Sequence, residues 1–188
     1  PHLSALASNK ASPKTSEKAS DKAASKSSEP ASDRIINDMQ AAFKRGDRKQ
    51  LTALLPKARG HILEPWAAYW ELSSRLDVAS ADEVQAFLNR YAGSYQEDRL
   101  RNDWLLVLGR RRDWAAFVPE HAKYRMGDDR QVRCYALLAQ NNPNLAAMVE
   151  DLWLSQKEAD DACAAAAEHM LQAGALKPHT AWLRARLG

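Results

Sequence analysis

From Asp33 onward, the apolar residues of this chain recur at intervals of three and four positions, in one segment after another. This spacing places them on one face of an α-helix, which has about 3.6 residues per turn. No segment of comparable length shows the alternation of apolar and polar residues that a half-buried β-strand requires. The pattern therefore predicts that residues 34–188 form an all-α domain.

The most distinct predicted helix lies in the segment SADEVQAFLNRYAG, residues 80–93. Ser80 and Glu83 have the spacing of a capping box, in which each side chain binds the backbone N–H of the other residue. Gly93 is suited to end the helix because glycine readily adopts a left-handed conformation. The apolar stripe, which must pack against another element, consists of Val84, Phe87, Leu88 and Tyr91.

The composition changes near residue 33. Before that point Ala, Ser, Lys and Pro dominate, and Leu3 and Leu6 are the only large apolar residues. Burial of so little apolar surface cannot offset the entropy lost on folding. We therefore expect residues 1–33 to be a disordered Ala/Ser/Lys-rich tail that acts as a spacer, with a cell-wall or membrane tether as the less favoured alternative. Asp33 would cap the first helix, and Gly46 would end it.

The stretch EDRLRNDWLLVLGRRRDWAAF, residues 97–117, combines three consecutive arginines with two tryptophans. Its periodicity predicts two helices and a turn, with Trp104 and Trp114 on the apolar faces and Asp113 capping the second helix. Arginines near the C-terminus of a helix meet its free carbonyl groups and the negative end of its dipole. The run from Gly109 to Arg112 therefore needs no ligand to explain it, and a structural role is favoured over RNA binding.

Two further predicted helix pairs follow, in residues 128–156 and 159–188. Their spacing is typical of stacked helix pairs, although no strict repeat period and no full tetratricopeptide signature is found. We expect an irregular right-handed superhelix, or solenoid, of helix pairs with about ten short helices. Because a solenoid needs a polar cap at its end, the natural protein is expected to continue beyond Gly188, so that residues 34–188 would be a truncated scaffold domain.

Charge and hydropathy argue against two classes of partner. The 27 basic and 24 acidic residues leave a net charge of only +3, which provides no broad cationic surface for nucleic acid. No apolar run approaches the roughly 20 residues that span a bilayer. We expect neither a nucleic-acid partner nor an integral membrane segment.

The residue types that carry catalysis are present but not in recognisable patterns. None of the five histidines has the partner spacing of a zinc motif, and each is expected at the surface or at a helix end. The seven glycines are scattered and form no phosphate-binding loop. The sequence therefore predicts no catalytic residue, no metal site and no cofactor.

The two cysteines, Cys134 and Cys163, allow two interpretations. In a reducing compartment both would be small buried apolar residues. In an oxidising compartment a disulfide between them would close a loop of about 30 residues and add about 3.5 kcal/mol of stability. The residues alone leave this choice open.

Three segments in order resemble the N-terminal superhelical region of the soluble lytic transglycosylases of Gram-negative bacteria. They are YQEDRLRNDWLLVLGRRRDWAAF, QVRCYALLAQ and LWLSQKEADDACAAAAEHMLQAGAL. In that family a long helix ending in RRxDW is followed by a helix with a cysteine, an LWL segment and a second cysteine. The resemblance covers roughly residues 34–188. The matching motif residues are Arg111, Arg112, Asp113, Trp114, Leu152, Trp153 and Leu154, together with Cys134 and Cys163.

The resemblance implies an exported periplasmic enzyme whose signal peptide is missing here. Such an enzyme cleaves the β-1,4 bond between N-acetylmuramic acid and N-acetylglucosamine in peptidoglycan and leaves 1,6-anhydromuramoyl ends. The family's catalytic glutamate lies in a C-terminal domain with ES and GLMQ motifs, and neither string occurs in this sequence. The chain would therefore be an inactive scaffold fragment that meets glycan strands through the full-length enzyme and its own catalytic domain. The resemblance also implies a disulfide between Cys134 and Cys163.

The sequence also permits two alternatives to the scaffold hypothesis. One is a free-standing periplasmic interaction module that binds protein partners along a concave face, as helical repeats do. The other, which is less favoured, is an RNA-associated helical-repeat protein that uses the GRRR run.

Overall fold

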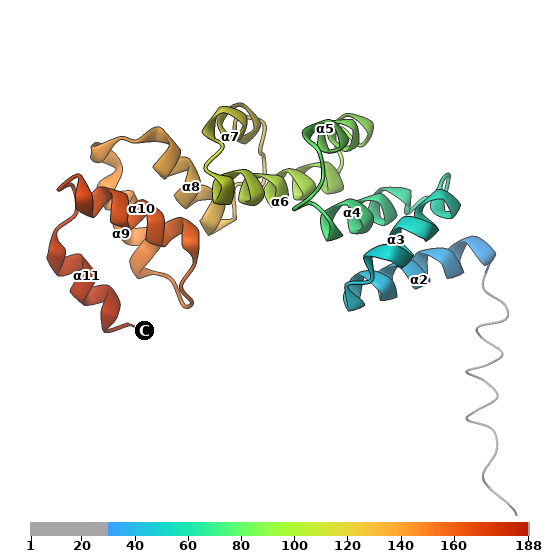
Figure 1. The fold of residues 1–188 in the computed structure, drawn as a ribbon, viewed down its shortest axis with the longest axis horizontal. Coiled ribbons are helices and arrows are strands. Elements are labelled where there is room, and N and C mark those ends of the chain that lie inside the picture. Colours follow the sequence, from blue (N-terminus) through green and yellow to red (C-terminus); the bar gives the residue numbers. More distant parts are fainter. Residues whose placement is uncertain (1–29, 188) are drawn as a thin grey trace, which may run out of the picture.

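The computed structural model describes residues 30–187, and every regular element in that range is helical (Figure 1). The α-helices are α2 (Ala31–Arg45), α3 (Arg48–Leu54), α4 (Glu64–Ser74), α5 (Ala81–Arg90), α6 (Tyr95–Arg111), α7 (Trp114–His121), α8 (Arg130–Gln140), α9 (Ala146–Leu154), α10 (Asp161–Gln172) and α11 (Pro178–Ala185). Two short 3-10 helices, η1 (Leu55–Ala58) and η2 (Pro143–Leu145), precede α4 and α9. The all-α prediction is confirmed for this range. The tail predicted for residues 1–33 falls mostly on residues 1–29, which lie outside the described part.

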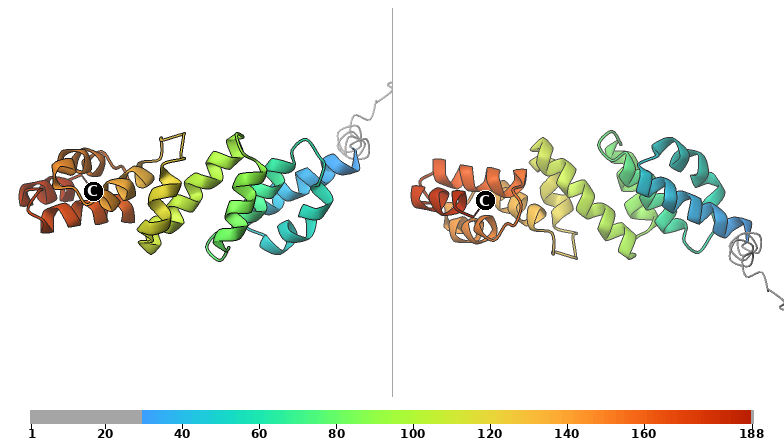
Figure 2. Two further views of the ribbon diagram at one scale, coloured as in Figure 1. Left: turned by 90° about the horizontal axis from the view of Figure 1, so that it is seen from above. Right: turned by 90° about the horizontal axis from the view of Figure 1, so that it is seen from below.

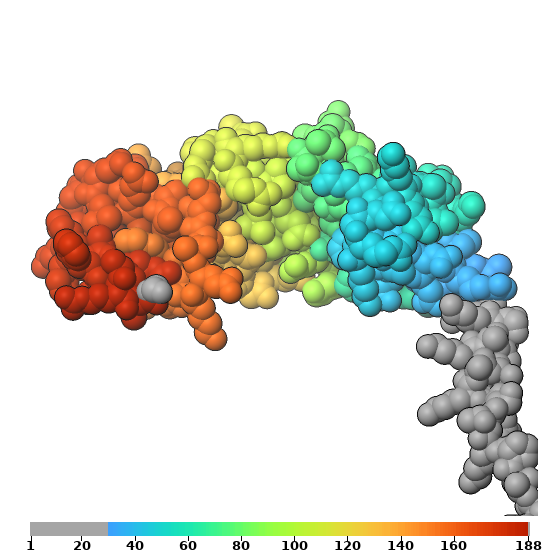
Figure 3. All heavy atoms as spheres, turned by 60° about the horizontal axis from the view of Figure 1, so that its bottom comes forward, coloured from blue at the N-terminus to red at the C-terminus, as the bar shows by residue number. Residues whose placement is uncertain are grey.

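The helices stack in one direction and form an elongated body (Figures 1, 2 and 3). Alternate helices touch in succession, since α2 contacts α4, α4 contacts α6, α6 contacts α8 and α8 contacts α10. The intervening helices α3, α5, α7 and α9 each pack against the helix that follows them. Such nearest-neighbour packing is the organisation of a helical-repeat protein. The right hand expected for the superhelix stays a prediction.

The first helix begins earlier than its sequence predicts. Helix α2 begins at Ala31 after Pro30, and no side chain caps its first turn. Asp33 is therefore not the cap that we expected. Its carboxylate lies 2.8 Å from Nε2 of His61, a residue in the loop before α4. A contact with a residue so distant in sequence competes with the local capping interaction, and the sequence alone does not reveal it.

Helix α5 confirms the predicted capping box. The Ser80 hydroxyl accepts the backbone N–H of Glu83 at 3.2 Å, and the Glu83 carboxylate accepts the backbone N–H of Ser80 at 2.9 Å. The helix ends at Arg90, and Gly93 adopts a positive φ of 82° in the turn that follows. Gly93 thus ends the turn rather than the helix itself.

Helices α6 and α7 form the predicted hairpin, with one difference at the turn. Gly109 belongs to α6, and Arg112 ends that helix with a left-handed φ of 58°. A β-carbon at Gly109 would overlap the ring of Tyr135 on α8. Glycine at this position therefore allows the close approach of α8 to α6.

The apolar core runs along the whole stack instead of forming one central cluster. Its largest fully buried side chains include Met39, Leu51, Leu105, Phe117 and Met170, which come from helices between α2 and α10. Trp104 on α6 is 4% exposed, as its place in the apolar stripe predicts. No helix in residues 30–187 combines the length and the apolar character needed to cross a bilayer.

Replacement of Trp104 by Ala should lower the free energy of unfolding by about 3–5 kcal/mol, because it leaves a cavity in the core where α6 packs against its neighbours. Trp182 on α11 is 71% exposed and provides a matched control. Trp182→Ala should change the free energy by less than about 0.5 kcal/mol. Urea unfolding followed by circular dichroism measures both, and equal losses in the two variants would contradict the assignment of Trp104 to the core.

Candidate functional site

In the arginine-rich motif at the α6–α7 junction, Arg111 and Arg112 contact other parts of the same chain. The Arg111 guanidinium lies 5.7 Å from the ring centre of Trp104 and donates to the Asp77 carbonyl oxygen at 2.7 Å. Asp113 caps α7, since its carboxylate accepts the N–H of Ala116 at 3.2 Å. In these contacts Arg111 and Asp113 bind groups of the chain itself, and the structural role expected for the run stays a prediction.

Arg112 connects α6 to two later helices. Its guanidinium donates to the Gly109 carbonyl at 2.8 Å, pairs with the Asp161 carboxylate at 3.1 Å and lies 5.4 Å from the ring centre of Tyr135. The Tyr135 hydroxyl donates to the same Asp161 at 2.7 Å. Arg112 thus fastens the end of α6 to α8 and to the first turn of α10.

These contacts shift the pKa values of two groups in opposite directions. Burial, reinforced by the hydrogen bond to Asp161, raises the pKa of Tyr135 to about 12. The same Tyr135 hydrogen bond, together with Arg112, lowers the pKa of Asp161. At neutral pH the tyrosine therefore keeps its proton as a donor and the aspartate accepts as an anion, which is the combination that the contact requires.

Cys134 and Cys163 form a disulfide that joins α8 to α10, as the resemblance implies. Both residues are fully buried. The backbone N–H of Cys163 donates to Asp160, the cap of α10, at 2.9 Å. Asp160 also pairs with Arg130 at the start of α8, at 3.1 Å. The first halves of both helices are therefore held together by a covalent bond and by one ion pair.

A second connection lies at the opposite ends of the same two helices. The Asn141 side-chain oxygen lies 2.6 Å from Nε2 of His169. Asn141 is seven residues after Cys134, and His169 is six residues after Cys163, so the two helices run parallel. At 1.5 Å per residue, the two connections lie about 10 Å apart.

Between these parallel helices and the motif lies a groove of about 560 Å³, which we call the α8–α10 groove. Its walls include Arg112, Trp114, Leu138, Asn141, His169 and Gln172. The structure thus brings Arg112 and Trp114 of the motif beside both cysteine-bearing helices. His169, expected at the surface or at a helix end, lies in the last turn of α10 and is a half-buried member of this wall.

The LWL motif lies elsewhere and has a packing role. Leu152 is buried in α9, Trp153 packs against the core from a partly exposed position, and Leu154 is partly exposed. None of the three lines the α8–α10 groove. The motif therefore packs α9 against the core and does not contribute to the candidate site.

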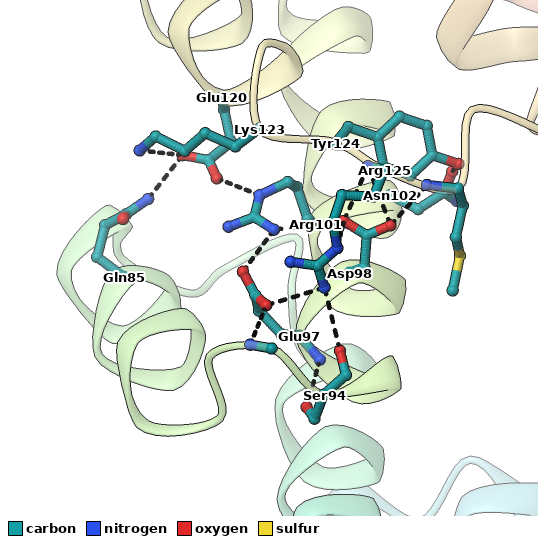
Figure 4. A network of polar contacts seen from close by, with 12 residues as sticks. Gln85, Ser94, Glu97, Asp98, Arg101, Asn102, Glu120, Lys123, Tyr124 and Arg125 are labelled. Atoms are coloured by element: carbon teal, nitrogen blue, oxygen red, sulfur yellow. Dashed lines mark hydrogen bonds and ion pairs between the residues drawn. The ribbon is translucent and has the colours of Figure 1, made fainter.

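A buried cluster of charged residues on α6 was not predicted from the sequence. The Arg101 side chain is only 5% exposed and lies 2.7 Å from Glu97, 3.4 Å from Asp98 and 2.7 Å from Glu120 of α7 (Figure 4). Asp98 in turn accepts the backbone N–H of Met126 at 2.7 Å. We call Glu97, Asp98, Arg101 and Glu120 the Arg101 cluster. It joins α6 to α7 and to the loop that precedes α8.

The charges of the Arg101 cluster stabilise one another. Burial alone would raise the pKa of Glu97, but hydrogen bonds from the Gly93 backbone and from Arg101 outweigh it and lower that pKa. Burial likewise opposes the charge of Arg101, and its bonds to Glu120 and Glu97 raise its pKa nevertheless. Arg125 and Lys123, which are about half exposed, add positive charge at the rim. The cluster is therefore a structural ion-pair network in its charged state.

One signal in the sequence could have revealed part of this cluster. Glu97 and Asp98 lie four and three residues before Arg101, a spacing that brings their side chains together on one helix. The partner Glu120 lies on a different helix and gives no such local signal. No group of three metal-binding side chains is found within residues 30–187.

Arg101→Met should lower the free energy of unfolding by about 3–5 kcal/mol, because it leaves three buried carboxylates without their central cation. Arg48, which is 53% exposed and pairs with the exposed Asp77 at 3.3 Å, provides the control. Arg48→Met should change the free energy by less than about 1 kcal/mol. Denaturant titration compares the two, and a mild effect at Arg101 would show that the cluster is not a structural network.

The double variant Cys134→Ala/Cys163→Ala should lose about 3.5 kcal/mol of unfolding free energy, because its unfolded state is no longer restrained by the 29-residue link. Reduction of the unmodified chain should produce a similar loss under the same denaturant titration. Alkylation of both thiols without prior reduction, detected by intact-mass measurement, would contradict the disulfide.

Comparison with known proteins places the fold. No protein-family model and no curated protein matches the sequence. A solved complex of a 70-kDa soluble lytic transglycosylase with bulgecin A matches at a TM-score of 0.60 and 19% identity over 83% of this chain. An inactive mutant of the lytic transglycosylase Slt from Pseudomonas aeruginosa matches at a TM-score of 0.60 and 29% identity over 82% of this chain.

The chain spans about a quarter of the length of these two proteins, 26% and 25% respectively. The match therefore concerns a segment of each enzyme and not the whole molecule. Within that limit, the chain folds into a helical region like that of the soluble lytic transglycosylases.

Proposed function

We propose that this chain is the N-terminal scaffold region of a soluble lytic murein transglycosylase, an enzyme that cleaves the MurNAc–GlcNAc bond of peptidoglycan and forms 1,6-anhydromuramoyl ends. The observation that carries the proposal is the structural match over more than four fifths of the chain to two such enzymes. The order of the RRRDW, cysteine and LWL motifs supports it independently.

In this proposal the chain supplies no catalytic group. Four carboxylate residues are buried within residues 30–187. Glu97, Asp98 and Glu120 belong to the Arg101 cluster, where cations and backbone N–H groups bind them, and Glu71 pairs with Arg75 at 2.8 Å. The role of the scaffold is to shape how glycan strands reach a catalytic domain elsewhere in the enzyme. The disulfide favours an exported protein, since such bonds persist in oxidising compartments such as the periplasm.

The last helix offers a surface for the proposed catalytic domain or for further helices. Trp182 and Leu183 of α11 are 71% and 36% exposed. Exposed large apolar side chains on a terminal helix are costly in isolation and are covered when a further repeat packs on them. This surface supports a scaffold that continues into other parts of a larger protein. It would equally serve a free-standing interaction module, so activity must separate the two.

A peptidoglycan digestion assay tests the proposal. Purified sacculi are incubated with this chain and with the longer gene product, and soluble products are analysed by mass spectrometry for 1,6-anhydromuramoyl ends. We expect such products from the longer protein alone, because only it would contain a catalytic glutamate. The longer protein with that glutamate replaced by Gln is the matched control. An inactive longer protein, or a gene that ends near Gly188, would favour the interaction module instead.

A further inference from the structure

We propose that the α8–α10 groove is an accessory binding site for an N-acetylated saccharide, a segment of glycan strand held on the scaffold away from the catalytic domain. The identity of the saccharide as peptidoglycan glycan rests on the proposed function. The existence and chemistry of the site rest on the groove itself. Its volume of about 560 Å³ falls within the usual range for small-molecule sites.

The groove is held rigidly. The Cys134–Cys163 disulfide joins its two helices at one end, and the Asn141–His169 contact joins them at the other. Arg112 adds a third connection through Asp161. A site whose walls are already in place loses little conformational entropy when it binds a ligand. The groove is thus preorganised, in contrast to an incidental gap between mobile helices.

The lining has the two kinds of surface that a sugar ring needs. Trp114, partly exposed, and Leu138 and Ala165 provide apolar surface for the C–H face of a pyranose. Asn141, His169 and Gln172 provide hydrogen-bonding groups. The lining thus combines apolar and polar side chains in similar proportion, which suits a ring that has one apolar face and polar groups around its edge.

The polar groups of this rim retain unused bonding positions. Asn141 and His169 each use one side-chain atom in their mutual contact, and Gln172 uses its amide nitrogen with Glu168 at 3.2 Å. The amide nitrogen of Asn141, the second ring nitrogen of His169 and the amide oxygen of Gln172 have no partner among residues 30–187. Donors and acceptors side by side suit hydroxyl and acetamido groups, which both donate and accept.

The charge of the lining excludes other ligand classes. Its Arg112 and Glu168 have opposite signs, and Arg112 is already paired with Asp161. A polyanion such as RNA requires an excess of cationic groups, which this lining lacks. The groove also offers no group of three metal ligands within the described chain. A neutral, polar ligand with one apolar face fits these constraints, and an N-acetylated sugar is such a ligand.

The test uses the chain itself and two soluble probes, the neutral N-acetylglucosamine tetramer and a peptide-bearing GlcNAc–MurNAc muropeptide, in which an amide bond to the peptide takes up the lactyl carboxyl group of MurNAc. Titration is followed by ¹H–¹⁵N NMR, in which the indole N–H of Trp114 and the amide signals of α8 and α10 report binding. We expect shifts confined to these signals. The double variant His169→Ala/Gln172→Ala should weaken binding about tenfold, since it removes two polar contacts.

Two further variants make the result specific. Gln40→Ala, on the exposed face of α2, is the matched control and should bind like the unmodified chain. Asn141→Gly keeps the left-handed residue that ends α8, with a φ of 48°, and removes the rim amide, so it should weaken binding without a loss of fold. Circular dichroism melting confirms that each variant folds.

The outcomes separate this inference from the proposed function. Shifts at another surface, equal affinity of the double variant and the control, or binding only to peptide-bearing muropeptides would each overturn the saccharide site. Peptidoglycan cleavage by the longer protein would then leave the proposed function standing. Saccharide binding in the groove together with an inactive longer protein would support the saccharide site and contradict the proposed transglycosylase function.

Discussion

The burial of α6 on several sides is the constraint on which the rest of this structure depends. Helix α6 contacts α4, α5, α7, α8 and α10, and its buried residues include both apolar side chains such as Leu105 and the charged Arg101. An α-helix that buries polar residues as well as an apolar stripe must be covered on more than one face. Its neighbours supply that cover, with Glu120 from α7 for the charge and Tyr135 from α8 against Gly109. The stack is therefore built outward from α6.

The RRRDW motif owes its position to this same helix. Arg111 and Arg112 leave the end of α6, and both turn back to the protein, one to Trp104 and the Asp77 carbonyl and the other to Asp161. A cationic run at the negative end of a helix dipole is already favourable, and the added contacts make it a fastening between distant helices. Its proximity to the disulfide is a consequence, because Asp161 opens the helix that carries Cys163.

The scaffold proposal and the saccharide inference draw on different parts of this architecture. The first depends on the whole row of helices, since the structural match extends over most of the chain. The second depends on one pair, α8 and α10, whose parallel course and two connections hold a groove open beside Trp114. A helical-repeat scaffold commonly presents binding surface along its length, so a local site and a scaffolding role are physically compatible.

The sequence by itself determined the helices, the capping box of α5, the α6–α7 hairpin and the burial of Trp104, because periodicity and caps act between residues at most four apart. Through family resemblance it also indicated the disulfide. Only the tertiary structure decided that Asp33 meets His61, that Arg101 gathers three carboxylates and that Asn141 meets His169. The Asp33–His61 and Asn141–His169 contacts each join residues that are 28 positions apart, and the Arg101–Glu120 contact joins residues that are 19 positions apart. Their pairing follows from which helix faces touch, and local spacing carries no information on that.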